Sequence, residues 1–143
     1  VARIFNTYGP KMQQDDGRVI SNFIIQALNN KPLTIYGDGS QTRSFCYVDD
    51  LIAGLIKFMN KTEDFTGPLN LGNDLELSIL DIANKIIQLS GSKSSIQYLD
   101  SLPDDPIQRR PDLSLANQSI GWNPSTKIDE GILLSIEYFK TII

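Results

Sequence analysis

Residues 35–50, with the sequence IYGDGSQTRSFCYVDD, combine the signals of two strands, a turn and the start of a helix. Residues 37–40 form a glycine-rich turn between two runs of β-branched and aromatic residues, which are typical of strands. Asp49 or Asp50 is predicted to cap a helix, because an apolar helical pattern begins directly after them. This stretch therefore predicts a chain that mixes strands and helices.

Strands and helices continue to alternate on both sides of this stretch. Ser78 and Asp81 form a capping-box arrangement at the start of one helix, and Gly91 is a favourable residue for its end. The spacing of apolar residues predicts strands at 1–5 (a buried one), 33–36, 42–48, 68–71 and 95–99, and helices at 18–29, 50–59, 78–90, 113–120 and 128–142. Such alternation is typical of the α/β or α+β class, and 143 residues fit one domain.

The bulk composition excludes several classes of protein. A net charge of -4 argues against binding to nucleic acid or to anionic membranes, because those surfaces need clustered Lys and Arg. Cys46 is the single cysteine, so the chain forms no intrachain disulfide, and a cytoplasmic or other reducing compartment is expected. The lumen of the Golgi also stays possible as the compartment of a longer protein that contains this chain. No apolar run reaches the roughly 18 residues of a membrane span.

The usual catalytic apparatus is incomplete in these residues. The chain has no histidine, which excludes histidine-based triads and histidine metal sites. It contains neither a GxGxxG nor a GxxxxGK[ST] motif, and none of its five tyrosines is followed by a lysine four positions later. The sequence therefore predicts no catalytic residue and no metal site. A small anionic ligand, which needs only a few arginines, stays possible.

Two arginines have alternative interpretations. Arg43 lies inside the predicted strand 42–48, either at an exposed edge with its stem along an aromatic ring, or as part of an anion clamp beside the glycine-rich turn. Arg109 lies in a charged loop, where it either pairs with Asp104, Asp105 or Asp112 or serves as a second clamp. A diphosphate carries two negative groups, so two separate arginines suit it.

Two other segments are candidates for ligand contact. Asn6 lies just past the carboxyl end of the predicted strand 1–5, which is where open α/β sheets bind ligands, although it also suits a simple turn. The predicted helix that starts near Arg18 presents backbone N–H groups, which attract anions, although its apolar residues are also those of an ordinary amphipathic helix.

Six segments taken in order form a recognisable set: VARIFNTYGP, DGRVISNFIIQAL, LTIYGDGSQTRSFCYVDDL, PLNLGN, DDPIQRRPDL and IGWNPSTKIDEG. Together they resemble the C-terminal part of the extended short-chain dehydrogenase/reductases that act on nucleotide sugars. Within that superfamily the set is most similar to the UDP-glucuronate decarboxylases, or UDP-xylose synthases. That family carries a GxxGxxG NAD-binding turn and a Tyr-x-x-x-Lys catalytic pair upstream, and neither occurs here.

The resemblance implies a Rossmann-type α/β fold with a small mixed sheet and without its N-terminal dinucleotide-binding half. Residues 1–10 then form the last part of the Rossmann sheet and a ligand loop, and 11–143 form the substrate-binding region. It implies NAD as cofactor, contacted by Thr7 and Arg18. It implies a UDP-sugar as ligand, contacted by Asn6, Val19, Ser21, Asn22, Phe23, Tyr36, Arg43 and Arg109.

Departures from the family pattern keep alternatives open. Lys11 stands where decarboxylases often have arginine, and Gln108 stands where a basic residue is common. A dTDP-glucose 4,6-dehydratase or a nucleotide-sugar 4-epimerase shares most of the motifs, and a non-catalytic interaction domain also fits the missing catalytic pair. An exposed apolar edge at 1–5 invites strand pairing, so a homodimer or larger oligomer is expected.

Overall fold

The computed structural model describes residues 1–61, 65–103 and 106–143. Its helices are α1 (Val19–Leu28), α2 (Val48–Met59), α3 (Ile79–Ser90), α4 (Ser114–Ile120) and α5 (Ile128–Lys140). Its strands are β1 (Ala2–Ile4), β2 (Thr7–Tyr8), β3 (Leu33–Tyr36), β4 (Thr42–Ser44), β5 (Cys46–Tyr47), β6 (Leu69–Leu71), β7 (Glu76–Ser78), β8 (Ile96–Leu99) and β9 (Gln108–Arg109).

The described strands form several small sheets rather than one continuous sheet. Parallel pairs join β1 to β6, β2 to β5 and β3 to β8. A mixed three-stranded sheet has β4 at its centre, with β7 antiparallel on one side and β9 parallel on the other. The expectation of a small mixed α/β fold is confirmed.

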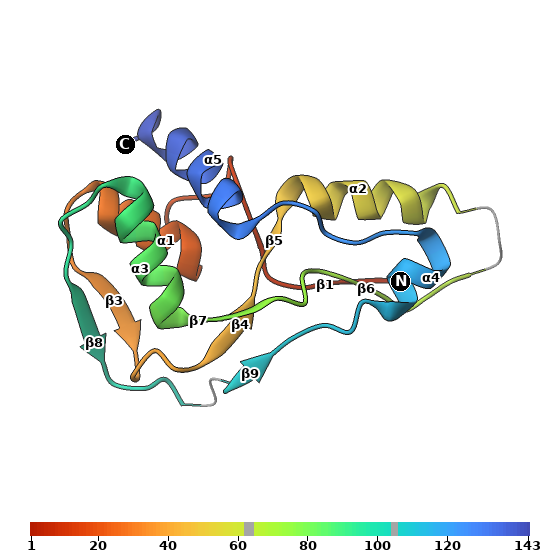
Figure 1. Ribbon diagram of the computed structural model, residues 1–143, viewed down its shortest axis with the longest axis horizontal. Helices are drawn as coiled ribbons and strands as arrows, with labels where there is room; N and C mark the ends of the chain where they lie inside the picture. The colour runs from red at the N-terminus through yellow and green to blue at the C-terminus, as the bar shows by residue number, and fades with distance from the viewer. Residues whose placement is uncertain (62–64, 104–105) are drawn as a thin grey trace.

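Two apolar cores lie at opposite ends of the molecule. Figure 1 shows α1, α3 and α5 gathered beside β3 and β8, whereas α2 and α4 lie with β1 and β6 at the other end. The first core contains the buried residues Ile20, Phe23, Ile24, Leu33, Ile35, Ile82, Ile86, Ile132, Ile136 and Phe139, among others. Each fully buried leucine or isoleucine contributes roughly 1.5–3 kcal/mol, whereas a backbone hydrogen bond adds only about 1 kcal/mol. Helix packing therefore holds these short strands in place.

Several local predictions are confirmed. The strand predicted at 33–36 matches β3, and α1 and α5 occupy the predicted helical segments. The Ser78 hydroxyl oxygen accepts a hydrogen bond from the Asp81 backbone N–H at 3.0 Å, which caps α3. Gly91 ends α3 in the left-handed conformation with φ 68°, as its position predicted.

The structure of residues 35–50 differs from its prediction in two ways. The predicted strand 42–48 is interrupted at Phe45 and forms β4 and β5, which pair with different partners. Helix α2 begins at Val48 with Tyr47 as its N-cap, so neither aspartate caps it. The Asp50 carboxylate instead accepts hydrogen bonds from the Ser125 hydroxyl at 3.0 Å and the Thr126 N–H at 2.8 Å.

Three further strand expectations need correction. The strand predicted as buried at 1–5 pairs with β6, but Ile4 is 57% exposed. Strand β7 was absent from the prediction, and β9 lies in a segment expected to be a loop. Both are very short and depend on β4 for their pairing, so no periodicity of their own marks them.

Candidate functional site

Two neighbouring cavities lie between α1 and the strands β2, β3 and β4. The first, of about 240 Å³, is lined by Asn6, Thr7, Tyr8, Met12, Gly17, Arg18, Val19, Ile20, Arg43 and Phe45. The second, of about 210 Å³, is lined by Gly17, Val19, Asn22, Phe23, Thr34, Ile35, Tyr36, Gln41, Arg43, Ile79 and Leu102. Gly17, Val19 and Arg43 border both, so the two cavities meet at these residues.

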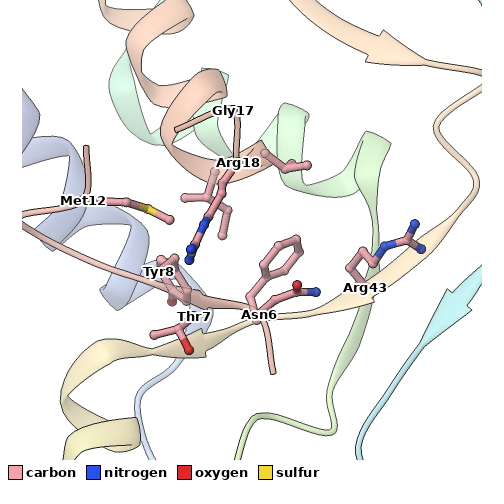
Figure 2. Close-up of a pocket in the computed structure, with 10 residues that line it drawn as sticks. Asn6, Thr7, Tyr8, Met12, Gly17, Arg18 and Arg43 are labelled. Carbon is pink, nitrogen blue, oxygen red and sulfur yellow. The ribbon is translucent and has the colours of Figure 1, made fainter. Parts of the chain in front are cut away.

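Strand β2 and the start of α1 supply most of the polar groups of the first cavity. The Asn6 side-chain amide donates to the Ser44 carbonyl at 3.4 Å, which ties this segment to β4. The Thr7 hydroxyl donates to the Phe5 carbonyl at 2.8 Å. In the view of Figure 2, Asn6 lies between Arg18 and Arg43, and all three residues line this cavity.

Arg43 occupies a central position, and its interpretation as an exposed edge residue is wrong. Its strand β4 is hydrogen-bonded on both sides, and the residue is only 9% exposed. The guanidinium Nη1 donates to the Thr42 carbonyl at 2.8 Å. Because Arg43 is a nearly buried cation that borders both cavities, this position is a candidate for anion recognition.

Arg109 lies beside Arg43 through strand pairing. In the parallel β4–β9 ladder the Cα positions of Arg43 and Arg109 are direct partners, and such partners send their side chains to the same face. Arg109 is exposed and is not among the described residues that line either cavity. The predicted interpretation of Arg109 pairing with Asp104 or Asp105 falls outside the described residues.

The remaining predicted site residues separate into two groups. Val19, Asn22, Phe23 and Tyr36 all line the second cavity. Ser21 does not line either cavity: it is fully buried, and its hydroxyl donates to Asp16 Oδ1 and to the Arg18 carbonyl, both at 3.0 Å. Ser21 therefore fixes the start of α1 from within.

The two backbone sites expected to attract anions already have acceptors in part. The Arg18 N–H at the start of α1 donates to Asp16 Oδ1 at 3.1 Å. In the glycine-rich turn, Asp38 Oδ1 accepts from the Ser40 N–H at 2.9 Å and from the Ser40 hydroxyl at 2.6 Å. These hydrogen bonds lower the pKa of Asp38. The backbone N–H groups of Arg18 and Ser40 are therefore already bonded to carboxylates of this chain.

Sequence reasoning missed several lining residues, including Gln41 and Thr34. The Gln41 side chain donates to the Tyr36 carbonyl at 2.8 Å. The strand alternation of β3 places Thr34 on the same side as Tyr36, so that signal was available. Leu102 reaches the second cavity from the charged loop, and no local pattern marked it.

Tyr8 is the buried tyrosine among the described residues that line the first cavity. Its hydroxyl donates to the Ile128 carbonyl at 3.4 Å. Burial, helped by the nearby Cys46 and Tyr47, raises the pKa of Tyr8 well above its usual range. The phenol therefore stays protonated at neutral pH, which suits a wall residue rather than a base.

Comparison with known proteins decides the family. The model of the NAD dependent epimerase/dehydratase family matches residues 1–72, just over half of the chain. The chain belongs to this family. The resemblance to extended short-chain dehydrogenase/reductases, drawn from the six sequence segments, is thereby confirmed, as is the Rossmann-type α/β fold class.

Relatives within the family are close in sequence and longer than this chain. The UDP-glucuronic acid decarboxylase 1 of Danio rerio is 50% identical over 140 residues, which cover 98% of this chain and 33% of that protein. The UDP-glucuronic acid decarboxylase 3 of Arabidopsis thaliana is 48% identical over 98% of this chain and 40% of its own length. The chain thus spans 40% or less of the length of these curated relatives.

Solved structures of the family have the same fold. The UDP-glucuronic acid 4-epimerase of Bacillus cereus, in complex with UDP-glucuronic acid and NAD, has a TM-score of 0.92 and 34% sequence identity. The match covers 99% of this chain and 45% of that chain.

No helix in the described part of the chain is long and apolar enough to cross a membrane.

Proposed function

We propose that this chain forms the nucleotide-sugar-binding part of an NAD-dependent UDP-glucuronate decarboxylase, which makes UDP-xylose. The observation that carries the proposal is the pair of cavities that meet at a buried arginine, with a second arginine beside it on the neighbouring strand. The 48–50% identity to decarboxylases supports this choice of reaction over the 34% identity to the Bacillus cereus epimerase.

The cavities suit a ligand of nucleotide-sugar size only in combination. Each is smaller than the roughly 300–1,000 Å³ typical of a small-molecule site, whereas the two together fall within that range. The ligand therefore lies across the junction at Arg43. Since a nucleotide sugar has a nucleoside at one end and a sugar at the other, the diphosphate lies at the centre, next to the cation.

The residues divide along this axis. Asn22, Phe23 and Tyr36 in the second cavity contact the nucleoside, and the Val19 segment forms the wall between the cavities. Arg43 and Arg109 bind the diphosphate, because guanidinium forks bind phosphate oxygens bidentately. Asn6 donates near the diphosphate or the sugar. Ser21 acts indirectly, because its buried hydroxyl holds Asp16 and thereby the start of α1.

NAD would contact this chain along one side of the first cavity. Thr7 and Arg18 both line that cavity, and the Arg18 side chain is 64% exposed, with its Nε 3.4 Å from Asp16 Oδ2. An exposed cation and a hydroxyl suit the polar parts of a dinucleotide. The 143 residues contain no glycine-rich phosphate-binding turn, so they fit only part of the cofactor.

On this proposal, oxidation of the C4 hydroxyl of the sugar to a ketone makes C6 the carboxylate carbon of a β-keto acid. The C5–C6 bond then breaks and releases CO2, its electron pair forms an enolate with the C4 ketone, and a proton from water is added at C5. NAD, when bound, would supply the hydride chemistry: it would take a hydride from C4 of the sugar and later return it to the ketone. The residues of this chain bind and orient the substrate, an effect that can supply several kcal/mol of barrier reduction. On this proposal residues 1–10 complete the Rossmann sheet and ligand loop, and 11–143 form the substrate-binding region.

Product analysis of the full-length protein tests the proposal. With UDP-glucuronate and NAD, we expect CO2 release and a UDP-pentose detected by mass spectrometry. A UDP-hexuronate of unchanged mass would instead identify a 4-epimerase, which the TM-score of 0.92 to the Bacillus cereus enzyme keeps as the second candidate. No binding of UDP at millimolar concentration, measured by calorimetry, would contradict both.

A further inference from the structure

Glu76 lies on the back of the three-stranded sheet, opposite the face that carries the arginines. In the register of the sheet, Glu76 is the partner of Ser44, and Gln108 is the partner of Thr42. Since side chains alternate along a strand, these residues share one face, and Arg43 and Arg109 share the other. The location of Arg43 in the cavities confirms which face is the front.

The Glu76 carboxylate binds groups on both sides of Arg109 in the chain. Both of its oxygens accept from the Gln108 side-chain amide at 2.8 Å. Oε1 also accepts from the Thr42 hydroxyl at 2.8 Å, so β4 and β9 are joined through one carboxylate. Arg110 Nη1 lies 3.9 Å from Oε2. These hydrogen bonds, first from Gln108 and then from Thr42, lower the pKa of Glu76.

The other described bonds between β9 and the rest of the molecule are few. Strand β9 contains only two residues, both exposed, so apolar burial contributes little to its position. Outside the ladder, the Thr42 N–H donates to the Ile107 carbonyl at 3.0 Å, and the Ser44 hydroxyl donates to the Arg109 carbonyl at 3.4 Å. A short, exposed strand of this kind opens easily unless side chains anchor it.

We propose that Glu76 is a positioning residue: by binding Gln108 and Arg110 behind the sheet, it holds Arg109 beside Arg43 at the front, where the diphosphate binds. Glu76 is not among the described residues that line the two cavities, so it acts through the backbone of β9. The inference rests on the proposed function, because the arginine pair needs a phosphate ligand. The negative charge of Glu76 lies behind the sheet, so Glu76 orders β9 without neutralising Arg43 and Arg109 at the site.

A double-mutant cycle in the full-length protein tests this role, with UDP as the probe and calorimetry as the readout. We expect Glu76→Ala to weaken UDP binding about tenfold, and Glu76→Gln, which keeps one acceptor oxygen, to weaken it less. Gln108→Ala should act in the same direction from the other side of the contact. Uridine, which has no phosphate, should bind all variants equally.

The coupling to Arg109 separates positioning from a general effect on folding. In an Arg109→Ala background, adding Glu76→Ala should change the Kd for UDP less than about twofold. Glu137→Ala is the matched control, because Glu137 also forms an exposed pair, with Lys140 at 2.9 Å, away from β9. Thermal melting of each variant identifies any that fail to fold, and Glu76→Gln and Gln108→Ala then carry the test.

The UDP and uridine binding results each support or contradict the positioning role of Glu76. Unchanged UDP binding by Glu76→Ala overturns the inference, as does an undiminished effect of Glu76→Ala without the Arg109 guanidinium. A loss of UDP and uridine binding in equal measure also overturns it, because it indicates a general structural role. If the wild-type protein binds no UDP, the proposed function itself fails, a result that the variants do not imitate.

Discussion

Replacing Arg43 by alanine should weaken the binding of UDP strongly and leave the binding of uridine nearly unchanged. Arg43 is 9% exposed and borders both cavities, so a phosphate bound to it is largely removed from water. Truncating one partner of a desolvated charge pair costs about 2–5 kcal/mol, which corresponds to roughly a 30- to 4,000-fold rise in Kd. Among its described contacts, the fold loses the bond from the charged guanidinium to the Thr42 carbonyl, worth about 1.5–3 kcal/mol.

Substitution by lysine separates charge from shape. Arg43→Lys keeps the positive charge but loses the planar fork, so we expect a smaller loss of UDP affinity than with alanine. Arg109→Ala serves as a graded comparison. Because Arg109 is exposed, its contact with phosphate is screened by water, and its removal should cost less than the removal of Arg43.

Calorimetric titration of the full-length protein with UDP and with uridine measures these effects. The expected pattern is a large loss for UDP and little change for uridine, because only UDP carries the diphosphate. A Kd for UDP within about threefold of the wild-type value in Arg43→Ala, or an equal loss for uridine, would refute the assignment of Arg43 to the diphosphate.

Three further predictions concern packing, reactivity and assembly. Gly131→Ala places a methyl group against the Tyr8 hydroxyl and 2.9 Å from a Tyr47 ring carbon. It should therefore lower the free energy of unfolding, measured by urea denaturation, by about 1–3 kcal/mol. The control Leu134→Ala, at a position 45% exposed on the same helix, should lower the free energy of unfolding much less. Cys46 is fully buried, and burial raises the pKa of its thiol to about 12, so a thiol reagent at pH 8 should modify it only after denaturation. Modification of the native protein within minutes would contradict this. In the described part of the chain β1 pairs on one side only, so the 143-residue chain should form dimers or larger assemblies through that edge, and a clean monomer in sedimentation velocity at high concentration would contradict that expectation.

Local sequence patterns predicted the helices and several strand segments because their causes are local. The Ser78 cap and the Gly91 stop each depend on atoms within a few residues, and the period of apolar residues marks α1, α3 and α5 directly. The family was also recoverable, because six short segments in a fixed order carry more information than any one of them.

Long-range features were not recoverable from the same patterns. The interruption of the strand at Phe45, the start of α2 at Val48 and the strand character of β7 and β9 all depend on partners distant in the sequence. Asp50 is an example. The local pattern predicts that it caps a helix, but its carboxylate accepts hydrogen bonds from the Ser125 hydroxyl and the Thr126 N–H instead. Tertiary hydrogen bonds therefore override the local preference.

The candidate site depends on this long-range pairing more than on any motif. Arg43 and Arg109 belong to segments far apart in the sequence, and a two-residue ladder puts them in register. A slip of one residue in that ladder would send Arg109 to the back face, because strand faces alternate. The Glu76 contacts with Gln108 and Thr42 oppose such a slip, since both partners must lie on the back face at the same time. The position of Arg109 on the front face therefore depends on contacts of Glu76 on the back face. A sequence comparison limited to ligand-contacting residues would omit Glu76.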